Sequence, residues 1–291
     1  TFPANTEKVH KHYSQWAIKH GLLTKNSKLL TPDLAYASAG VLQQSKLSHL
    51  NIYADYAVLT LAVDDVLDNK WREFESVSPI FDIIISALRQ KKTKKLANKT
   101  NFSFPKLEKF CDAYSDINSR LVKLTKNSSY FIESIVKHFD YLAKEFNYRK
   151  QNKTLSVPEY LELRIVTGGT ETFCELAYAL LGIELSKKIR NHEKYILCSE
   201  CAYQTLILVN DLTSYFKEKE QAHASDNYIV MQQRCNNIDA STAVKVCIDE
   251  HNRQVLRLFE LERSLLTMAD FSSEEKENLQ NALQILKQHL R

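Results

Sequence analysis

Residues whose types and spacing could do chemistry gather in two short stretches of this chain. The first is "VDDVLDNK", residues 63–70, which directly follows the apolar run "YAVLTLA" and contains three aspartates. On a helix, Asp64 and Asp68 lie on one face, with Asp65 beside them. Adjacent carboxylates at the end of a core segment cost free energy unless a cation is held there. The pattern suits a hard divalent cation such as Mg²⁺, and a solvated helix end is the alternative.

The second stretch is "VNDLTSYFKEKE", residues 209–220, at the end of another apolar segment. Asn210, Ser214 and Glu218 follow one another at intervals of four residues, so a helix places them on one face. They offer an amide oxygen, a hydroxyl oxygen and a carboxylate, all of which are ligands for a hard cation. Lys217, beside Glu218, supplies a point charge suited to a phosphate oxygen. Together the two stretches indicate a site for metal ions and a phosphorylated ligand.

Helical periodicity dominates the chain, so helices must position both stretches. Only 5 Gly and 5 Pro occur among 291 residues, fewer than the tight turns of a strand-rich fold require. Apolar spacing and helix start signals predict helices over residues 31–45, 47–68, 78–90, 102–124, 128–150, 156–166, 170–185, 194–221, 239–266 and 272–290. We therefore predict an all-α fold of about ten helices, in one domain that covers residues 1–291.

Composition limits the classes of function. The net charge is +4, and the basic stretch at residues 89–101 lacks interleaved aromatic residues, so we expect no nucleic-acid partner. A solvated loop between helices is a better interpretation of that stretch than a phosphate- or membrane-attracted patch. No run approaches the roughly 18 apolar residues of a membrane span, and the N-terminus lacks a secretory signal. We expect a cytoplasmic protein without stable membrane insertion, its six cysteines being buried free thiols.

The paired stretches resemble those of a known family, the class I terpene cyclases, in the single-domain type found in microbes, amoebae and octocorals. That family has an aspartate-rich motif on one helix and an N-D-x-x-S-x-x-K-E motif on another, at the mouth of an α-helical bundle. The resemblance also includes "ADYAVLTLAVDD", residues 54–65, "YLELRIVTGG", residues 160–169, and the surroundings of Trp16. It spans nearly the whole chain and implies the class I terpenoid synthase fold.

The resemblance also implies the ligands. The family binds three Mg²⁺ ions, for which Mn²⁺ can substitute, together with the diphosphate of a linear prenyl substrate. Asp64 would be the bridging metal ligand. By resemblance, the full set of metal ligands is Asp64, Asp65, Asp68, Asn210, Ser214 and Glu218. We expect the protein to be a monomer or a homodimer.

A third stretch of the chain matches the family between these two. Arg164 falls 46 residues before Asn210, which is the spacing of the family's diphosphate-sensing arginine. Thr167 and Gly168 then occupy the linker and effector positions that act with this arginine in catalysis. The chemistry agrees, since the guanidinium of an arginine can bind a phosphate through two parallel hydrogen bonds. A glycine at a helix break leaves a carbonyl free to face a ligand. Arg164 and Lys217 would bind the diphosphate.

The chain departs from the family near its C-terminus. There the family usually has an Arg-Tyr pair that closes over the diphosphate, whereas this sequence ends "KQHLR" at Arg291. Arg291 is either the first half of that pair or an ordinary cation at a helix end. We favour the first interpretation, but we leave Arg291 out of the predicted site.

Ionisation in such a family leaves an allylic carbocation in a dry cavity, where it cyclises. Aromatic faces attract cations, although an aromatic residue in a helical stripe is more often core packing. The candidate wall residues are Tyr56, Ala57, Thr60, Leu61, Phe81, Phe173 and Tyr203. Many relatives have aromatic residues at positions such as Leu59 and Leu61, just before the aspartates, and Thr60 and Ala57 are also modest in size. A smaller wall leaves room for a longer substrate, so we lean towards C20 geranylgeranyl diphosphate over the C15 farnesyl compound.

Two other functions remain open. A prenyl-chain elongating synthase shares the helical fold, but it needs two aspartate-rich motifs because it binds two diphosphate substrates. A non-catalytic helical scaffold would not need three types of metal ligand beside a basic sensor. The paired motifs therefore favour cyclisation of a single substrate.

Two further patterns have simple interpretations. Cys198 and Cys201 have the spacing of a redox or zinc pair, but the chain has no second such pair, so core packing is favoured. His10, His12 and His20 lie close together without a carboxylate at ligand spacing. We expect these histidines on the solvated surface.

Overall fold

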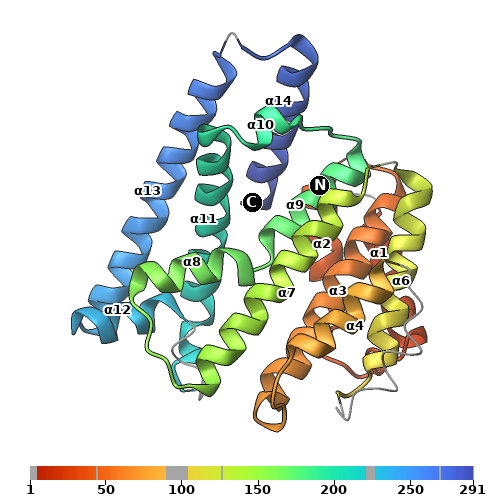
Figure 1. Ribbon diagram of the computed structural model, residues 1–291, viewed down its shortest axis with the longest axis horizontal. Coiled ribbons are helices and arrows are strands. Elements are labelled where there is room, and N and C mark those ends of the chain that lie inside the picture. Colours follow the sequence, from red (N-terminus) through yellow and green to blue (C-terminus); the bar gives the residue numbers. More distant parts are fainter. Residues whose placement is uncertain are drawn as a thin grey trace. The chain divides into compact units, whose positions relative to one another are not determined.

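The computed structural model describes residues 5–43, 45–89, 104–125, 127–220, 227–268 and 270–290. Every regular element in these residues is a helix, which confirms the all-α prediction (Figure 1). The α-helices are α1 (Thr6–Lys19), α2 (Asp33–Val41), α3 (Leu47–Lys70), α4 (Ser78–Leu88), α6 (Leu107–Leu124), α7 (Ser129–Lys150), α8 (Val157–Thr167), α9 (Thr170–Leu181), α10 (Lys187–Arg190), α11 (Glu193–Glu218), α12 (Tyr228–Asn236), α13 (Ala240–Leu266) and α14 (Ser273–His289). Arg291 and nearly all of the basic stretch at 89–101 lie outside the described residues.

The helices fall into two compact units. The first comprises Thr1–Phe146 with Glu175–Gly182, and the second comprises Asn147–Cys174 with Ile183–Arg291. The chain passes from one unit to the other inside α7 and inside α9. The single-domain organisation expected from the sequence stays a prediction.

In the first unit, α3 packs against α1, α2 and α6. These neighbours explain why residues 52–59 are all buried, whereas a surface helix buries only one stripe. The burial ends near Asp64, where the aspartates begin and the side chains become exposed. A short 3₁₀ turn, Trp71–Glu73, follows α3 directly. The long helix predicted from the apolar run is therefore confirmed, with its acidic stretch in the last two turns.

A network of ion pairs around one buried aspartate joins α1, α3 and α6 in this unit. Asp55 is fully buried, and its Oδ2 accepts hydrogen bonds from Arg120 Nη1 at 2.8 Å and from His12 Nε2 at 3.0 Å. Arg120 also pairs with Asp116, which His20 approaches to 3.9 Å. The expectation of solvated histidines is wrong, because these carboxylates are distant in sequence. His10 likewise contacts a distant group, the carbonyl oxygen of Leu30, at 3.2 Å.

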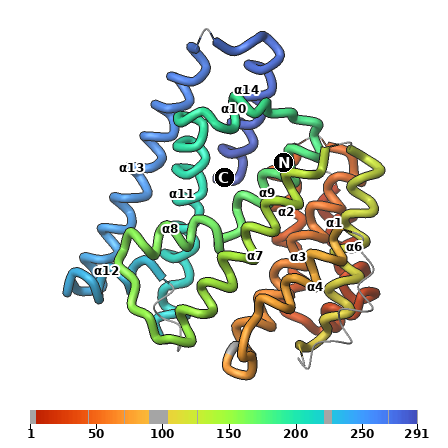
Figure 2. The backbone as a smooth tube through the Cα atoms, in the orientation of Figure 1, coloured from red at the N-terminus to blue at the C-terminus, as the bar shows by residue number. Residues whose placement is uncertain are grey.

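In the second unit, α11 contacts α8, α12, α13 and α14. Figure 2 shows α11 and α13 side by side along much of their length. The buried side of α11 includes Tyr203, Ile207 and Leu208. Beyond Leu208 the apolar run gives way to the polar stretch that begins with Asn210. The core helix thus positions the second predicted cluster in its last three turns.

The helix start and the helix break predicted around Arg164 are both confirmed. A capping box begins α8: Ser156 Oγ accepts from the backbone N–H of Glu159, and the Glu159 carboxylate accepts from the backbone N–H of Ser156. At the other end, α8 stops before Gly168, and Gly169 adopts a φ of 72° that favours glycine. A Cβ at Gly168 would lie 3.0 Å from the Arg164 carbonyl oxygen, so that position is closely packed.

All six cysteines are free thiols. Cys198 and Cys201 are buried within α11, which confirms that they are core residues. Cys111, Cys174 and Cys247 are also buried, but Cys235 is exposed. The prediction of six buried thiols is therefore wrong at Cys235, because this residue lies in the last turn of the short helix α12.

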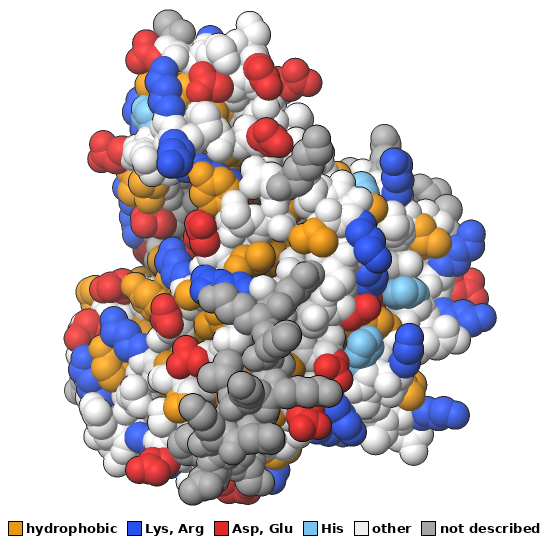
Figure 3. Space-filling model, turned by 45° about the vertical axis from the view of Figure 1, so that its right-hand side comes forward, with side chains coloured by type: hydrophobic (Ala, Val, Ile, Leu, Met, Phe, Trp, Pro, Cys, Tyr) orange, Lys and Arg blue, Asp and Glu red, His pale blue; other side chains and the backbone are white. Residues whose placement is uncertain are grey.

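The surface carries both signs of charge. Figure 3 shows acidic and basic side chains interspersed over one face, which agrees with a net charge of only +4. A search of the described helices for one that is long and apolar enough to cross a membrane finds no candidate.

Candidate functional site

The aspartate-rich stretch forms the C-terminal part of α3. Asp64, Asp65 and Asp68 are all exposed there. Asn69 Nδ2 donates hydrogen bonds to the backbone oxygen of Asp65 at 2.7 Å and to its Oδ1 at 3.0 Å. The second of these contacts holds the Asp65 side chain against its own helix.

The three aspartates do not form a complete metal site by themselves. Neighbouring residues on an α-helix are rotated by about 100°, so Asp65 is displaced from the line that joins Asp64 and Asp68. Among the described residues, no group of three or more His, Cys, Asp or Glu side chains could hold a metal ion. The stretch therefore offers the one or two carboxylates that a Mg²⁺ site commonly takes from a protein.

The second cluster lies on α11, where helical spacing aligns the predicted ligands. Asn210 is exposed, whereas Ser214 and Glu218 are half-buried. Lys217 is exposed beside Glu218. The cluster therefore keeps the first predicted ligand on the surface and the other two partly shielded.

The predicted sensor contacts the predicted cluster directly. Arg164 extends from α8, and its Nη2 donates a hydrogen bond to Asn210 Oδ1 at 3.2 Å. The same nitrogen lies 3.6 Å from Asp211 Oδ1. Helices α8 and α11 pack against each other, which brings these residues together although they are 46 positions apart. Arg164 and Asn210 are both site residues predicted from the sequence, but the hydrogen bond between them was not predicted.

Asp211 is a member of the site that sequence reasoning missed. It is fully buried, and its Oδ2 accepts hydrogen bonds from the Tyr160 hydroxyl and from the backbone N–H of Tyr228, the latter at 2.8 Å. Burial raises the pKa of Asp211, although the charge of Arg164 and both hydrogen bonds act to lower it. The available signal was an acidic residue within an apolar helix, next to Asn210.

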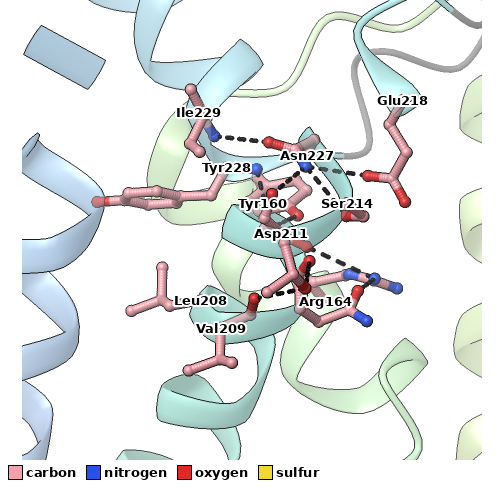
Figure 4. A network of polar contacts seen from close by, with 12 residues as sticks. Tyr160, Arg164, Leu208, Val209, Asp211, Ser214, Glu218, Asn227, Tyr228 and Ile229 are labelled. Atoms are coloured by element: carbon pink, nitrogen blue, oxygen red, sulfur yellow. Dashed lines mark hydrogen bonds and ion pairs between the residues drawn. The ribbon is translucent and has the colours of Figure 1, made fainter. Parts of the chain in front are cut away.

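Asn227 is the second residue that was missed. It is fully buried immediately before α12, and its Oδ1 caps that helix by accepting from the N–H of Ile229 at 3.0 Å. Its Nδ2 donates to the backbone oxygen of Asp211 at 2.7 Å and to Glu218 Oε2 at 2.9 Å, and it lies 3.5 Å from Ser214 Oγ. Figure 4 shows this side chain pointing at the polar face of α11. No pattern in the sequence marks it beyond its capping position before an apolar run.

The linker and effector residues lie at the end of α8. Thr167 is buried, and its Oγ1 has no hydrogen-bond partner within the described part of the chain. Gly168 is exposed, and a Cβ there would come within 3.2 Å of Ile207 Cγ1 on α11. A side chain at this position would therefore require Ile207 to shift by a few tenths of an ångström.

The donor set fits a hard divalent cation. Asn210, Ser214 and Glu218 present an amide, a hydroxyl and a carboxylate oxygen from one helix, and Mg²⁺ and Mn²⁺ favour such oxygen ligands. Two of the three ligands are already grouped, since the Asn227 amide lies within 3.5 Å of both Ser214 Oγ and Glu218 Oε2. Arg164 next to Asn210 supplies a fork suited to a phosphate.

The predicted wall residues occupy different environments. Tyr56 packs edge-on against Phe131 with ring centroids 5.1 Å apart, and Phe81 stacks on Phe139 at 4.5 Å. Both rings are buried in the aromatic core of the first unit. The remaining candidates are the buried Ala57 and Tyr203, the half-buried Thr60 and Phe173, and the exposed Leu61. A role for any of them in shaping a substrate stays a prediction.

The sequence matches the family model described as "Terpene synthase family 2, C-terminal metal binding" over residues 55–257. Terpene synthase 4 of Physarum polycephalum is 23% identical over 215 residues, which cover 74% of this chain and 63% of that protein. (+)-Eremophilene synthase of Sorangium cellulosum is 22% identical over 233 residues, covering 79% and 68%. Sesquiterpene synthase Agr5 of Cyclocybe aegerita is 23% identical over 140 residues, covering 48% and 33%. The chain thus spans between about one third and two thirds of the length of such relatives.

Solved structures agree in fold. Hedycaryol synthase in complex with nerolidol superposes with a TM-score of 0.76 at 16% identity, covering 100% of this chain and 96% of that protein. A cucumene synthase variant superposes with a TM-score of 0.80 at 16% identity, covering 99% and 92%. At such low identity this likeness establishes the helical fold alone.

Proposed function

This chain belongs to terpene synthase family 2, and on that premise we propose that it is a class I terpene cyclase. It ionises a linear prenyl diphosphate in a Mg²⁺-dependent step and cyclises the carbocation to a hydrocarbon or an alcohol. Loss of a proton from the cyclised cation gives the hydrocarbon, capture of a water molecule with loss of a proton gives the alcohol, and the diphosphate is released as the second product. In these terms the enzyme is a carbon–oxygen lyase acting on a phosphate ester.

One observation supports the proposal above all others. Arg164 hydrogen-bonds to Asn210, the first of three oxygen ligands that α11 presents at intervals of four residues. A guanidinium beside oxygen ligands suits a diphosphate that is chelated by metal ions, because both groups bind phosphate oxygens.

Each group of predicted site residues contributes differently to ionisation of the prenyl diphosphate. Bound Mg²⁺ ions supply Lewis acidity and a template for the diphosphate. Asn210, Ser214 and Glu218 would hold one ion, and the aspartates of α3 would hold the others. Arg164 binds the diphosphate through the parallel N–H donors of its planar guanidinium, and Lys217 adds a positive point charge beside it. Fixed positive charge at the departing group stabilises the negative charge that develops there.

The length of the prenyl chain is a separate proposal. The names of several relatives describe sesquiterpene synthases, which act at the C15 level. They give no support to the C20 preference drawn from Leu59, Leu61, Thr60 and Ala57. We therefore propose farnesyl diphosphate as the first substrate to test, with geranylgeranyl diphosphate as the alternative.

Location and assembly remain proposals as well. Six free thiols fit a reducing compartment, so we place the protein in the cytoplasm. A monomer or a homodimer is expected, which light scattering coupled to gel filtration would distinguish.

Product analysis by mass spectrometry tests the activity. The protein is incubated with C10, C15 and C20 prenyl diphosphates and Mg²⁺, each with and without isopentenyl diphosphate. A cyclic terpene formed from one substrate alone supports a cyclase, whereas a requirement for isopentenyl diphosphate would assign a chain-elongating synthase instead.

A double variant tests the metal ligands. Asp64→Ala combined with Asn210→Ala should abolish turnover while circular dichroism retains the helical signal. Turnover at the wild-type rate in this variant would refute the metal role of both stretches.

A further inference from the structure

The buried asparagine before α12 contacts two of the proposed metal ligands, and we propose that Asn227 is a positioning residue for Ser214 and Glu218. It holds their side chains in the arrangement that binds a divalent cation. The inference rests on the proposed function and adds to it a residue outside the metal-ligand motif.

The contacts of Asn227 fix which end of its amide faces the ligands. The backbone N–H of Ile229 must meet an acceptor, so Oδ1 points to α12 at 3.0 Å. The opposite end meets a carbonyl oxygen of Asp211 at 2.7 Å and the Glu218 carboxylate at 2.9 Å, both of which require a donor. A flipped amide would set lone pairs against lone pairs at α11 and two N–H donors against each other at α12. Nδ2 is therefore the group that faces α11.

The residue after Asn227 secures this placement. The backbone N–H of Tyr228 donates to Asp211 Oδ2 at 2.8 Å, while the Asn227 side chain donates to the backbone oxygen of the same aspartate. Tyr160 donates to Asp211 Oδ2 from α8. Two consecutive residues thus fasten the start of α12 to one residue of α11, as Figure 4 shows. The Asn227 amide therefore donates to Glu218 from a backbone segment that these hydrogen bonds hold in place.

Glu218 is the ligand that most needs such support. It is the last residue of α11, where the helix dipole disfavours a carboxylate. A long carboxylate side chain also has several rotamers, and ordering them on binding weakens affinity. A hydrogen bond from buried Asn227 removes part of that freedom before the ion arrives. Groups that orient metal ligands in this way typically change metal affinity by about 10- to 100-fold when they are removed.

Replacing Asn227 by serine separates the proposed positioning of Glu218 from the capping of α12. Asn227→Ser retains an oxygen that caps α12, but its shorter side chain cannot donate to Glu218. Asn227→Thr serves the same purpose if the serine variant does not fold. Asp239, which caps α13 through the N–H of Thr242 at 2.8 Å, provides a matched control outside the site. Asp239→Ala removes a cap in the same unit without touching a proposed ligand.

The experiment measures metal binding directly. Mn²⁺ is titrated into each protein in the presence of inorganic diphosphate, and free Mn²⁺ is followed by electron paramagnetic resonance. In Asn227→Ser the dissociation constant of the most weakly bound Mn²⁺ ion should be about tenfold higher than in wild type. In Asp239→Ala it should equal the wild-type value. In turnover assays, the Mg²⁺ concentration for half-maximal rate should rise by a similar factor, and the rate at saturating Mg²⁺ should change by less than about twofold.

The outcomes separate this inference from the function on which it rests. Wild-type affinity for Mn²⁺ in a folded Asn227→Ser protein would overturn the positioning role alone. Failure of the wild-type protein to bind Mn²⁺ with diphosphate would overturn the proposed function and the inference together. In a Glu218→Gln background, Asn227→Ser should weaken binding no further, and an undiminished effect there would exclude action through Glu218.

Discussion

Arg164 donates a hydrogen bond to Asn210 Oδ1 at 3.2 Å, joining α8 to the polar end of α11. The bond links a cation suited to diphosphate with an oxygen suited to Mg²⁺. Both side chains stay partly accessible, so a ligand can reach them. Buried Asp211 lies behind the pair, 3.6 Å from the same guanidinium nitrogen, and keeps the arginine charge near the site. This arrangement leads to the first prediction.

Replacing Arg164 by lysine should lower kcat/KM for the prenyl diphosphate by about 10- to 100-fold. The variant keeps the charge but loses the planar fork, and one charge-assisted hydrogen bond contributes about 1.5–3 kcal/mol. Steady-state release of diphosphate measures the effect. Arg253→Lys is the control, because Arg253 pairs with Glu250 on the exposed side of α13. Equal losses in the two variants would contradict a specific role for Arg164.

Replacing Glu218 by glutamine should raise the Mg²⁺ concentration for half-maximal turnover by about tenfold or more. The amide keeps the shape of the side chain but removes the only negative charge among the three ligands of α11. A Mg²⁺ titration at fixed substrate measures this change. Glu220→Gln, an exposed carboxylate two residues further on, should leave the titration unchanged. If both variants behaved alike, the metal role of Glu218 would be refuted.

Removing the cap of α8 should affect both stability and binding. Ser156→Ala abolishes the capping box and should lower the free energy of unfolding by about 1 kcal/mol, as N-cap substitutions usually do. Because α8 carries Arg164, the KM for the prenyl diphosphate should rise as well. Urea denaturation and steady-state kinetics measure the two effects.

Ser272→Ala is the control for that variant, because Ser272 begins α14 with an identical capping box. It should lower stability by a similar amount, about 1 kcal/mol, and leave KM unchanged. A rise in KM in this control would mean that any loss of stability disturbs the site.

Stability should fall in weak acid partly because of His289. Burial lowers the pKa of this histidine from 6.5 to about 4, and its Nδ1 contacts the carbonyl oxygen of Ile285 at 2.9 Å. Between these two pKa values the unfolded chain binds a proton that the folded chain does not, so lowering the pH through this window destabilises the fold. From pH 7.5 to pH 5 the group should contribute a loss of about 2 kcal/mol.

Urea denaturation at pH 7.5 and pH 5 tests this contribution. His289→Gln cannot take up the proton, so its stability should fall less over that range than that of wild type. An equal fall in both proteins would show that His289 is not the group responsible.

Thiol labelling should distinguish one cysteine from the other five. Burial raises the pKa of Cys111, Cys198 and Cys247 to about 12, so these remain unreactive thiols near neutral pH. Cys235 is exposed. Native protein should therefore release one equivalent of chromophore from a disulfide reagent rapidly, and denatured protein six. Cys235→Ser should remove the rapid phase, and a rapid phase that persisted in this variant would contradict the assignment.

Local patterns predicted most of the elements. Apolar spacing indicated the long helices, and Ser156 and Gly168 marked the start and the end of α8 as observed. These features depend on residues within a few positions of one another, and that information is present in the sequence. For the same reason, intervals of four placed Asn210, Ser214 and Glu218 on one face of α11.

Contacts between helices could not be predicted in the same way. His12 pairs with Asp55 across 43 positions, and Asp211 accepts from Tyr160 across 51. Each partner taken alone resembles an ordinary polar residue. Only the packing of one helix on another shows that a carboxylate is buried and where its hydrogen-bond donors come from.

The sequence by itself determined the long helices, the break after α8 and the spacing of the oxygen-bearing side chains on α11, because all of these follow from residue chemistry and helical period. The tertiary structure decided which residues surround those ligands. Packing of α8 and α12 on α11 brings Arg164 to Asn210 and Asn227 to Glu218. Such neighbours arise from burial of apolar faces on several helices at once, and spacing along one helix does not encode that geometry.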